Sequence, residues 1–451
     1  MQKKIKVIRF IVESVLIIIL LAVLVNVYKD NNFNEYIKAQ SKLGNSEFLR
    51  DGKEKYSDMY SYKITNKDYS DAMFYKTIKV NPNMPYKVTC MVKTKDVMNN
   101  DQNSDAGAHI SINGTMEKSN NVIGTTDWTK IELIFNSKNR QSVDIGFRLG
   151  GYESDSIGTA WFSDMKIESG IPNIGPDWNF LCLIFDNTDV NVKINENIQN
   201  VKLSLNNEDI NDIKSSFKRF ETSLGELSKG KITANCTVIE LQDTIKTMSY
   251  SEENGYYVAP RDISNILDKY IQEGKYDHIF VSFKTGDLNK NIEIPTNDWI
   301  GLGSMEYRNI GFSNIRVPSD KNSYIYKYDT RINIFPEEVF IHEFLHTLEK
   351  NAEDYGYERP ELHDNEKYGY VNKNPIGLKN WYIDYINKNI KDGLDSKGLP
   401  EEIFDKKPAK TSDFVYTHKL NDFNEPANII EEIGAFTYKI TSTLKSLVNL
   451  K

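Results

Sequence analysis

The chain has 451 residues, a formal net charge of −8 and six histidines. This length predicts two or three domains, and a chain with 39% hydrophobic and 27% charged residues is typical of globular proteins. The acidic balance excludes nucleic acid as an expected partner, because no basic run with interleaved aromatic residues follows the first residues. Three cysteines are too few for a disulfide-rich scaffold: Cys90, Cys182 and Cys236.

The N-terminus combines basic residues with an apolar stretch. Residues 10–27 are predominantly apolar, and roughly 20 apolar residues in a helix span a bilayer. Four basic residues precede the stretch and should stay in the cytoplasm: Lys3, Lys4, Lys6 and Arg9. A cleaved signal peptide is the alternative, but no small-x-small cleavage site follows the apolar core. We therefore expect a transmembrane anchor over residues 1–29, which places the rest of the chain outside the cell.

Residues 30–55 are polar and charged, and we expect a stalk there. Residues 56–170 show an all-β pattern, in which short alternating segments are separated by turn residues. Many short strands at such spacing predict a β-sandwich. The alternating segments cover residues 86–94, 108–112, 130–135, 144–149 and 160–167.

The β region resembles the jelly-roll carbohydrate-binding modules. The likeness rests on Gly124-Thr125-Thr126-Asp127-Trp128-Thr129, on Phe147-Arg148-Leu149-Gly150 and on Gly158-Thr159-Ala160-Trp161-Phe162-Ser163-Asp164. The resemblance implies glycan binding, for which Trp161, Trp128 and Tyr152 are candidate stacking residues. The alternative for both tryptophans is packing in the sandwich core. Ser163 stands where family members often carry an acidic residue, which argues against a bound structural calcium ion.

Residues 171–176 contain two prolines and a glycine and predict a linker. A mixed α/β pattern follows over residues 177–451. We expect His278 to be structural, Cys182 and Cys236 to lie in the core, and residues 301–303 to form a turn. The expected strands cover residues 180–185, 232–241 and 276–284, and the expected helices cover residues 207–227 and 259–273.

The pattern H-E-x-x-H occurs once, from His342 to His346. Two histidines four residues apart share one helix face and can reach one cation. Glu343 is placed to take a proton from metal-bound water. Pro336 suits a helix start, and an apolar stripe predicts that one side of the helix is buried: Ile341, Leu345 and Leu348. The alternative is an amphipathic helix with two surface histidines.

A catalytic zinc usually has three protein ligands and one open position. The longer metzincin pattern is absent, because Glu349 and Ala352 replace its glycine and its third histidine. Glu349 either supports a ligand or is a charge on the helix surface. We expect His363 to be the third ligand, with Glu432 or Glu431 in a predicted helix over residues 428–438 as the alternative. Tyr368 or Tyr370 is a candidate donor to an oxyanion.

The region from 177 to 451 resembles zincin metallopeptidases, in which an edge strand lies above the metal. Residues 323–335 alternate and are expected to form that strand. The predicted fold is therefore multi-domain: a transmembrane helix, an all-β jelly-roll sandwich and an α/β (α+β) zincin-like domain.

The predicted function is that of a zinc-dependent endopeptidase on a bacterial cell surface. It would bind Zn²⁺ and cleave extracellular protein or glycoprotein substrates, with the sandwich as an accessory glycan-binding domain. One alternative is a non-catalytic surface glycan-binding protein with an inactive zincin domain. Another is a hydrolase of amide bonds in cell-wall peptides, because a zinc-activated water attacks many carbonyls.

Overall fold

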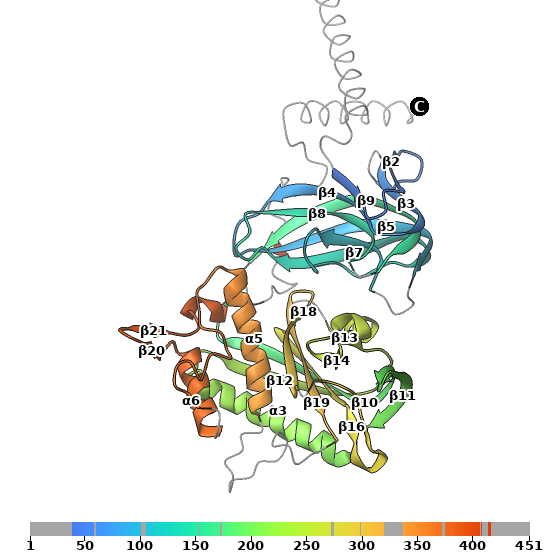
Figure 1. The fold of residues 1–451 in the computed structure, drawn as a ribbon. Coiled ribbons are helices and arrows are strands. Elements are labelled where there is room, and N and C mark those ends of the chain that lie inside the picture. Colours follow the sequence, from blue (N-terminus) through green and yellow to red (C-terminus); the bar gives the residue numbers. More distant parts are fainter. Residues whose placement is uncertain are drawn as a thin grey trace, which may run out of the picture.

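The computed structural model describes most of the chain in two units, an upper β-sandwich and a lower α/β unit (Figure 1). The described residues are 38–57, 60–100, 105–152, 154–171, 174–271, 275–297, 299–319, 337–371, 375–405, 407 and 414–415. The expected membrane helix over residues 1–29, the expected strand over 323–335 and the expected helix over 428–438 lie outside them. No helix within the described residues is long and apolar enough to cross a membrane.

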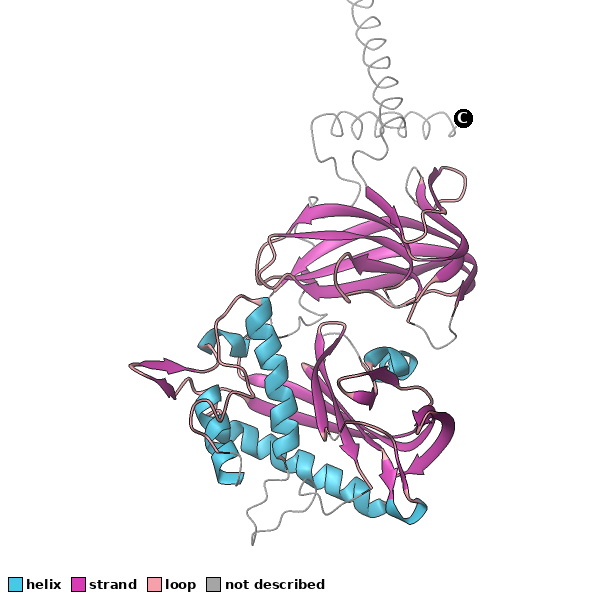
Figure 2. Cartoon of the chain, viewed as in Figure 1, coloured by secondary structure: helices cyan, strands magenta, loops and turns pink. Residues whose placement is uncertain are grey.

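The first unit is a sandwich of two antiparallel sheets (Figure 2). One sheet has the order β1 (Lys38–Ser41), β4 (Ala72–Lys79), β8 (Ser142–Gly150), β6 (Gly107–Ile112). The other has the order β2 (Ser46–Asp51), β3 (Ser61–Ser70), β9 (Ser156–Gly170), β5 (Pro85–Asn99), β7 (Gly124–Asn136), and the short β22 (Phe414–Val415) also pairs with β9. The predicted β-sandwich is confirmed.

Alternating side chains of the two sheets fill the space between them. Phe147 of β8 stacks on Phe162 of β9 with ring centroids 4.9 Å apart, and Phe74 of β4 is fully buried beside them. The expected stalk over residues 30–55 is wrong from residue 38 onward, because β1 and β2 belong to the sandwich. These strands are short and polar, and they lie at sheet edges. They bury few side chains, so their sequences show little alternation of apolar and polar residues.

The second unit contains a mixed sheet with the order β11 (Asn197–Ser204), β10 (Asp177–Ile194), β15 (His278–Lys284), β19 (Ile310–Val317), β18 (Gly301–Tyr307), and β12 (Thr233–Ile245) also pairs with β10. Strands β10, β12, β15 and β19 run parallel, whereas β11 and β18 are antiparallel to their neighbours. β18 is therefore an antiparallel edge strand. The predicted linker over residues 171–176 lies between β9 and β10.

Helices cover both faces of this sheet. Phe180, Cys182 and Ile184 of β10 pack in a core with α3 (Asn207–Leu227), α5 (Glu338–Asp354) and α6 (Pro375–Ile386). The intervening β10 residues Leu181 and Leu183 pack in a second core with α4 (Ser264–Tyr270). A continuous apolar run with both faces buried is what a central parallel strand requires.

The remaining elements are short. They are β13 (Ser249–Ser251), β14 (Gly255–Tyr257), β16 (Gly286–Asp287), β17 (Ile292–Glu293), β20 (Ile390–Asp392), β21 (Asp395–Lys397) and the 3₁₀ turns Pro260–Ile263, Leu288–Lys290 and Glu401–Asp405.

Two sequence expectations need correction in this unit. The helix expected over residues 259–273 is a 3₁₀ turn followed by α4, which ends at Tyr270. The turn expected at residues 301–303 is the beginning of β18. Gly301 and Gly303 indicate a turn in the sequence, but in the structure they allow β18 to lie close to α5. The expected helix over residues 207–227 coincides with α3, which begins with a capping box between Asn206 and Asp209.

Candidate metal centre

Helix α5 carries the H-E-x-x-H pattern and is fixed by its buried side. Phe344 lies edge-on to Trp178 and Phe180, with ring centroids 5.2 and 4.9 Å away. The predicted apolar stripe of Ile341, Leu345 and Leu348 is fully buried, as expected. His342 and His346 lie outside this core, and their side chains keep 24% and 16% of their exposure. Core packing therefore sets the direction in which the two rings point.

The chain returns to α5 after the helix ends. Gly356, with a φ of +76°, turns the backbone, and the amide of Tyr357 donates to the Ala352 carbonyl. The Leu362 amide then donates to Glu349 Oε1 at 2.7 Å, and Trp381 Nε1 donates to the Leu362 carbonyl at 2.8 Å. These bonds fix the position of the next residue, His363.

The structure brings the three predicted histidine ligands together. His363 Nε2 lies 3.1 Å from His342 Nε2 and 3.2 Å from His346 Nε2. Ligands of a tetrahedral zinc ion with Zn–N distances near 2.0–2.1 Å are about 3.3 Å apart. Within the residues that the structure describes, this is the one group of three or more histidine, cysteine or acidic side chains that could hold a metal ion. The donor set fits zinc: two of the three spacings are close to this tetrahedral distance, and the three ligand atoms all lie within 4.8 Å of one another.

The other ring nitrogen of each helix histidine has a partner. His346 Nδ1 lies 2.9 Å from Glu349 Oε2, and His342 Nδ1 lies 3.0 Å from the Tyr382 hydroxyl. The Tyr382 hydroxyl in turn donates to the carboxylate of Glu338. With Nδ1 as the proton donor, Nε2 of both rings presents a lone pair. Glu349 is only 6% exposed and orients the candidate ligand His346, so it is not a charge on the helix surface.

The surroundings of His342 and His363 favour the neutral form of both rings. Burial holds the pKa of His342 well below its usual value, and His346 and His363 lower it further. Burial also lowers the pKa of His363, with His346 as the second cause. Neutral imidazoles with converging lone pairs repel one another, and a shared cation removes that repulsion.

Glu343 lies between α5 and the edge strand β18. A Cβ on Gly301 would come within 2.3 Å of Glu343 Oε1, and a Cβ on Gly303 within 2.7 Å of Glu343 Oε2. The Gly303 amide donates to this carboxylate. Burial raises the pKa of Glu343 well above its usual value, the charge of Glu338 adds to the rise, and the Gly303 amide opposes it. Glycine at both positions lets β18 lie directly on the carboxylate.

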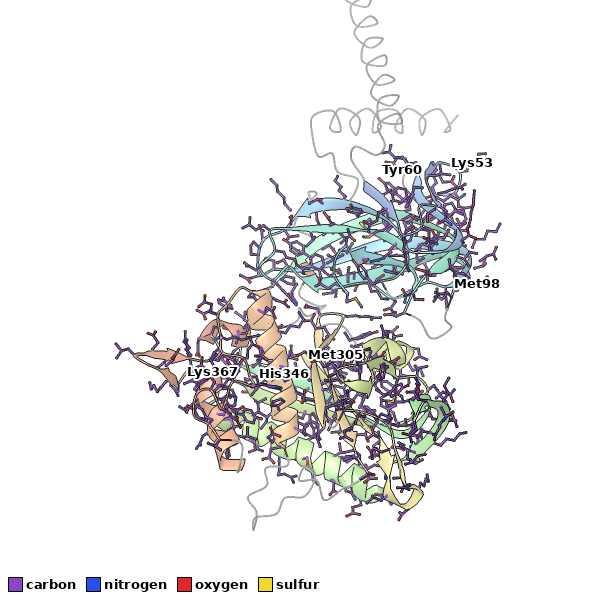
Figure 3. All side chains as sticks on the ribbon, viewed as in Figure 1. Lys53, Tyr60, Met98, Met305, His346 and Lys367 are labelled. Atoms are coloured by element: carbon purple, nitrogen blue, oxygen red, sulfur yellow. The ribbon has the colours of Figure 1, made fainter. Side chains whose placement is uncertain are left out.

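An open cavity of about 550 Å³ reaches His346 and His363, between β18 and the loop that carries His363. Figure 3 labels His346 of α5 and Met305 of β18. Its lining residues are Ser304, His346, Glu349, Lys350, Glu353, Arg359, Glu361, Leu362, His363 and Asp364. His346 and His363 are therefore accessible from solvent through this cavity.

The tyrosines proposed as oxyanion donors have other partners. The Tyr370 hydroxyl donates to Asp384, and the rings of Tyr368 and Tyr370 pack on Trp381. Glu431 and Glu432, the alternatives to His363, lie outside the described residues. Tyr382 and Glu338 were missed in the sequence, where only their polar character at helical positions could have indicated a role.

The aromatic candidates of the sandwich do not form one platform. Trp161 is 9% exposed and donates from Nε1 to Asp51, on the outer side of the β2–β7 sheet. Trp128 lies on the same outer side, with its ring centroid 5.9 Å from that of Tyr56. Tyr152 stacks on the guanidinium of Arg148, an outward residue of the opposite sheet. Neither tryptophan belongs to the central core cluster of the sandwich.

His278 is structural, as expected. Its ring is fully buried between the hydroxyls of Ser313, 3.1 Å from Nε2, and Thr347, 3.0 Å from Nδ1. Cys182 is fully buried as expected, whereas Cys236 is only half-buried.

No protein-family model and no curated protein sequence matches the chain. Among solved structures, it is similar to TmCBM61 in complex with β-1,4-galactotriose, at 11% identity and a TM-score of 0.22, over 29% of this chain and 86% of that one. It is also similar to the CBM22-1 xylan-binding domain from Paenibacillus barcinonensis Xyn10C, at 12% identity and a TM-score of 0.21, over 30% of this chain and 85% of that one. A family 11 carbohydrate-binding module from Clostridium thermocellum matches at 14% identity and a TM-score of 0.18, over 29% of this chain and 86% of that one. These neighbours are carbohydrate-binding modules, and each match leaves more than two thirds of this chain unmatched.

Proposed function

We propose that the α/β unit is a zinc-dependent hydrolase that cleaves peptide bonds. The observation that supports this most is the convergence of three histidine Nε2 atoms at 3.1 and 3.2 Å, with a buried glutamate one residue after the first of them. His342, His346 and His363 would hold the ion. A bound zinc ion would supply a polarised carbonyl and a water of lowered pKa.

Glu343 is the proton acceptor in this proposal. Its carboxylate is buried, and the Gly303 amide restrains one side of it. Burial favours the neutral carboxylic acid, so a proton taken from an attacking water stays on Glu343 until it passes to the leaving amine. A cation held by the histidines would work against the rise in pKa and keep the resting group ionised.

The substrate lies along β18 in this proposal. β18 is at the end of its sheet, and no described strand pairs with its second edge. An exposed edge offers backbone donors and acceptors to an extended peptide. Because Gly301 and Gly303 of this strand contact Glu343, a peptide added to β18 would bring one of its carbonyls close to the histidines. This geometry favours a peptide over a cell-wall amide, which does not need an extended backbone.

Glu343→Gln tests the chemistry. The amide keeps the shape and the Gly303 contact but cannot accept a proton, so we expect cleavage of a peptide library to fall by about 10²-fold or more, while zinc stays bound at wild-type stoichiometry. Glu226→Gln, on an exposed residue of α3 outside the cavity, is the matched control and should cleave normally. Equal cleavage rates for Glu343→Gln and the wild type would rule out this mechanism.

The cell-surface location rests on the basic and apolar residues before residue 30, which lie outside the described residues. Membrane fractionation of the full chain, compared with a chain lacking residues 1–29, tests the anchor. We expect the full chain in the membrane fraction with its α/β unit open to added protease, and a soluble full chain would contradict the anchor.

A second candidate function is glycan binding by the sandwich. Tyr56 is 51% exposed and its ring lies beside the partly buried Trp128, so the two present aromatic surface on the outer side of one sheet. Aromatic faces of this kind stack on sugar rings. We expect glycan-array binding to be lost in Trp128→Ala and kept in Tyr152→Ala, because Tyr152 lies on the opposite sheet. Unchanged binding by Trp128→Ala would remove this surface as the site.

A further inference from the structure

Lys138 links the sandwich to the α/β unit. It lies in the turn between β7 and β8, yet its Nζ reaches Glu306 Oε1 of β18 at 3.2 Å and the carboxylate of Asp354 at the end of α5. Its side chain is only 12% exposed, and each of the two carboxylates is 23% exposed. The three charges form an ion-pair group that is largely shielded from water.

The turn that presents Lys138 is held by hydrogen bonds of its own. The Arg140 amide donates to the Ser137 carbonyl at 2.9 Å, and the Asn83 amide donates to the Lys138 carbonyl at 2.8 Å. Lys138 has a φ of +50°, a conformation that non-glycine residues keep only where the surrounding structure imposes it. The lysine is therefore presented in a fixed direction by the sandwich.

The two carboxylates belong to the two elements that enclose the candidate metal centre. Glu306 is three residues after Gly303, which contacts Glu343 and His346. Asp354 ends the helix that carries His342 and His346. Both α5 and β18 direct one end toward the sandwich (Figure 1). One cation from the first unit thus joins the edge strand to the metal-binding helix of the second.

This contact does more than attach one unit to the other. Lys350 also pairs with Asp354 at 3.1 Å from within α5, whereas among the residues that the structure describes Lys138 is the one cation within ion-pair distance of Glu306. Without Lys138, the two shielded carboxylates of Glu306 and Asp354 would lose a positive charge that offsets their own. β18 could reduce the resulting repulsion by moving away from α5. The distance between β18 and α5 sets how closely Gly301 and Gly303 contact the Glu343 carboxylate.

We propose that the sandwich acts as a brace for the candidate active site, with Lys138 as a positioning residue that holds β18 against α5. The effect on β18 is independent of any metal. The effect on zinc affinity rests, in addition, on the function proposed above.

Hydrogen exchange of the full, metal-free chain tests the brace. In Lys138→Met we expect the amides of β18 and of the last turns of α5 to exchange about tenfold faster, while amides of β4, β8 and α3 keep their wild-type rates. A loss of overall stability would instead speed exchange in all of these elements. Lys130→Met is the matched control, because Lys130 lies on β7 and is 62% exposed; its exchange should equal that of the wild type.

Two further variants make the test decisive. Lys138→Arg keeps the charge and should restore wild-type exchange, whereas Glu306→Gln should loosen β18 alone, even if Lys138→Met fails to fold. Zinc affinity of Lys138→Met should be about threefold to tenfold weaker. Wild-type exchange in β18 of both Lys138→Met and Glu306→Gln would overturn the brace. If the wild type binds no zinc, the proposed hydrolase fails, but the exchange result still decides on the brace.

Discussion

The carboxylate of Glu349 holds two of the three candidate ligands at once. One oxygen accepts from His346 Nδ1, and the other accepts from the amide of Leu362, the residue before His363. Arg359 and Tyr385 also lie beside this carboxylate. A single side chain therefore couples a ring on the helix to the loop that supplies the third ring.

We expect Glu349→Ala to weaken zinc binding by about 10–100-fold, the usual cost of losing an orienting partner of a metal ligand. Glu349→Gln should fall between Ala and the wild type, because its amide can still accept one of the two hydrogen bonds. Competition with a fluorescent chelator measures both affinities. Glu353→Gln, one turn further along α5 and exposed, serves as the control. Wild-type affinity in Glu349→Ala would show that the hydrogen bonds to Glu349 do not orient the ligands.

His342, Glu343 and His346 could be predicted from sequence because their relation is local, set by the periodicity of one helix. The third ligand could not be decided from sequence. Its choice depends on how the chain turns after Gly356, and on the hydrogen bonds at Leu362 that bring His363 back. His363 is the residue that the structure places there.

Among the elements, β18 decides how the site is enclosed. It lies on α5 through Gly301 and Gly303, and its antiparallel pairing with β19 leaves its other edge without a described partner. The sequence predicts the edge strand over residues 323–335, which lie outside the described residues, and predicts a turn over residues 301–303. Glycine-rich strands give no alternating pattern, so their role is set by the neighbouring element and is not visible in the segment itself.

Gly301→Ala tests the close approach of β18 to α5. The new methyl group would lie 2.3 Å from Glu343 Oε1, so either β18 or the carboxylate must move. We expect peptide cleavage to fall by at least about tenfold and the free energy of unfolding to fall by about 1–3 kcal/mol. Leu302→Ala, at the position between the two glycines, should leave Glu343 undisturbed. If Gly301→Ala cleaves as fast as Leu302→Ala, β18 does not constrain the Glu343 carboxylate.

Elements with a strong local signal were predicted well. α3 coincides with the predicted range because Asn206 and Asp209 cap it and its apolar residues have helical spacing. β1 and β2 were missed because KAQS and SEFLRD contain few apolar residues and pair at sheet edges. Their strand conformation comes from backbone pairing with β4 and β3, which a single sequence does not reveal.

At the scale of the whole molecule, each unit buries a histidine that is neutral in the folded state. His278 in the α/β unit has a pKa lowered to about 3 by burial, and burial also lowers the pKa of His109 in the sandwich. In the unfolded chain a histidine titrates near pH 6.5. Between these values the unfolded state binds the proton and the folded state does not, so stability falls as the pH decreases from about 6.5 toward 3.

His278 should remove up to about 1.4 kcal/mol of stability per pH unit in this window, and the lowered pKa of His109 acts in the same direction. Urea unfolding of the metal-free protein at pH 7, 6 and 5 measures the slope. His278→Gln should be less stable at pH 7, because it disturbs the bonds to Ser313 and Thr347, but its stability should fall less steeply with decreasing pH. An identical slope in the variant and the wild type would mean that His278 is protonated in the folded state.

The whole molecule also joins two units whose sequence patterns are independent. The sandwich and the α/β unit were each predicted from their own periodicity. Their contact through Lys138 was not, since a lysine in a β-turn gives no signal of a buried partner.

Zinc titration of the metal-free full chain is the sharpest test of the three-histidine site. We expect one zinc ion per chain in the wild type and a loss of binding in His342→Ala, His346→Ala and His363→Ala alike, with the fold retained by circular dichroism. Zinc binding by His363→Ala at wild-type affinity, or no stoichiometric zinc in the wild type, would contradict it.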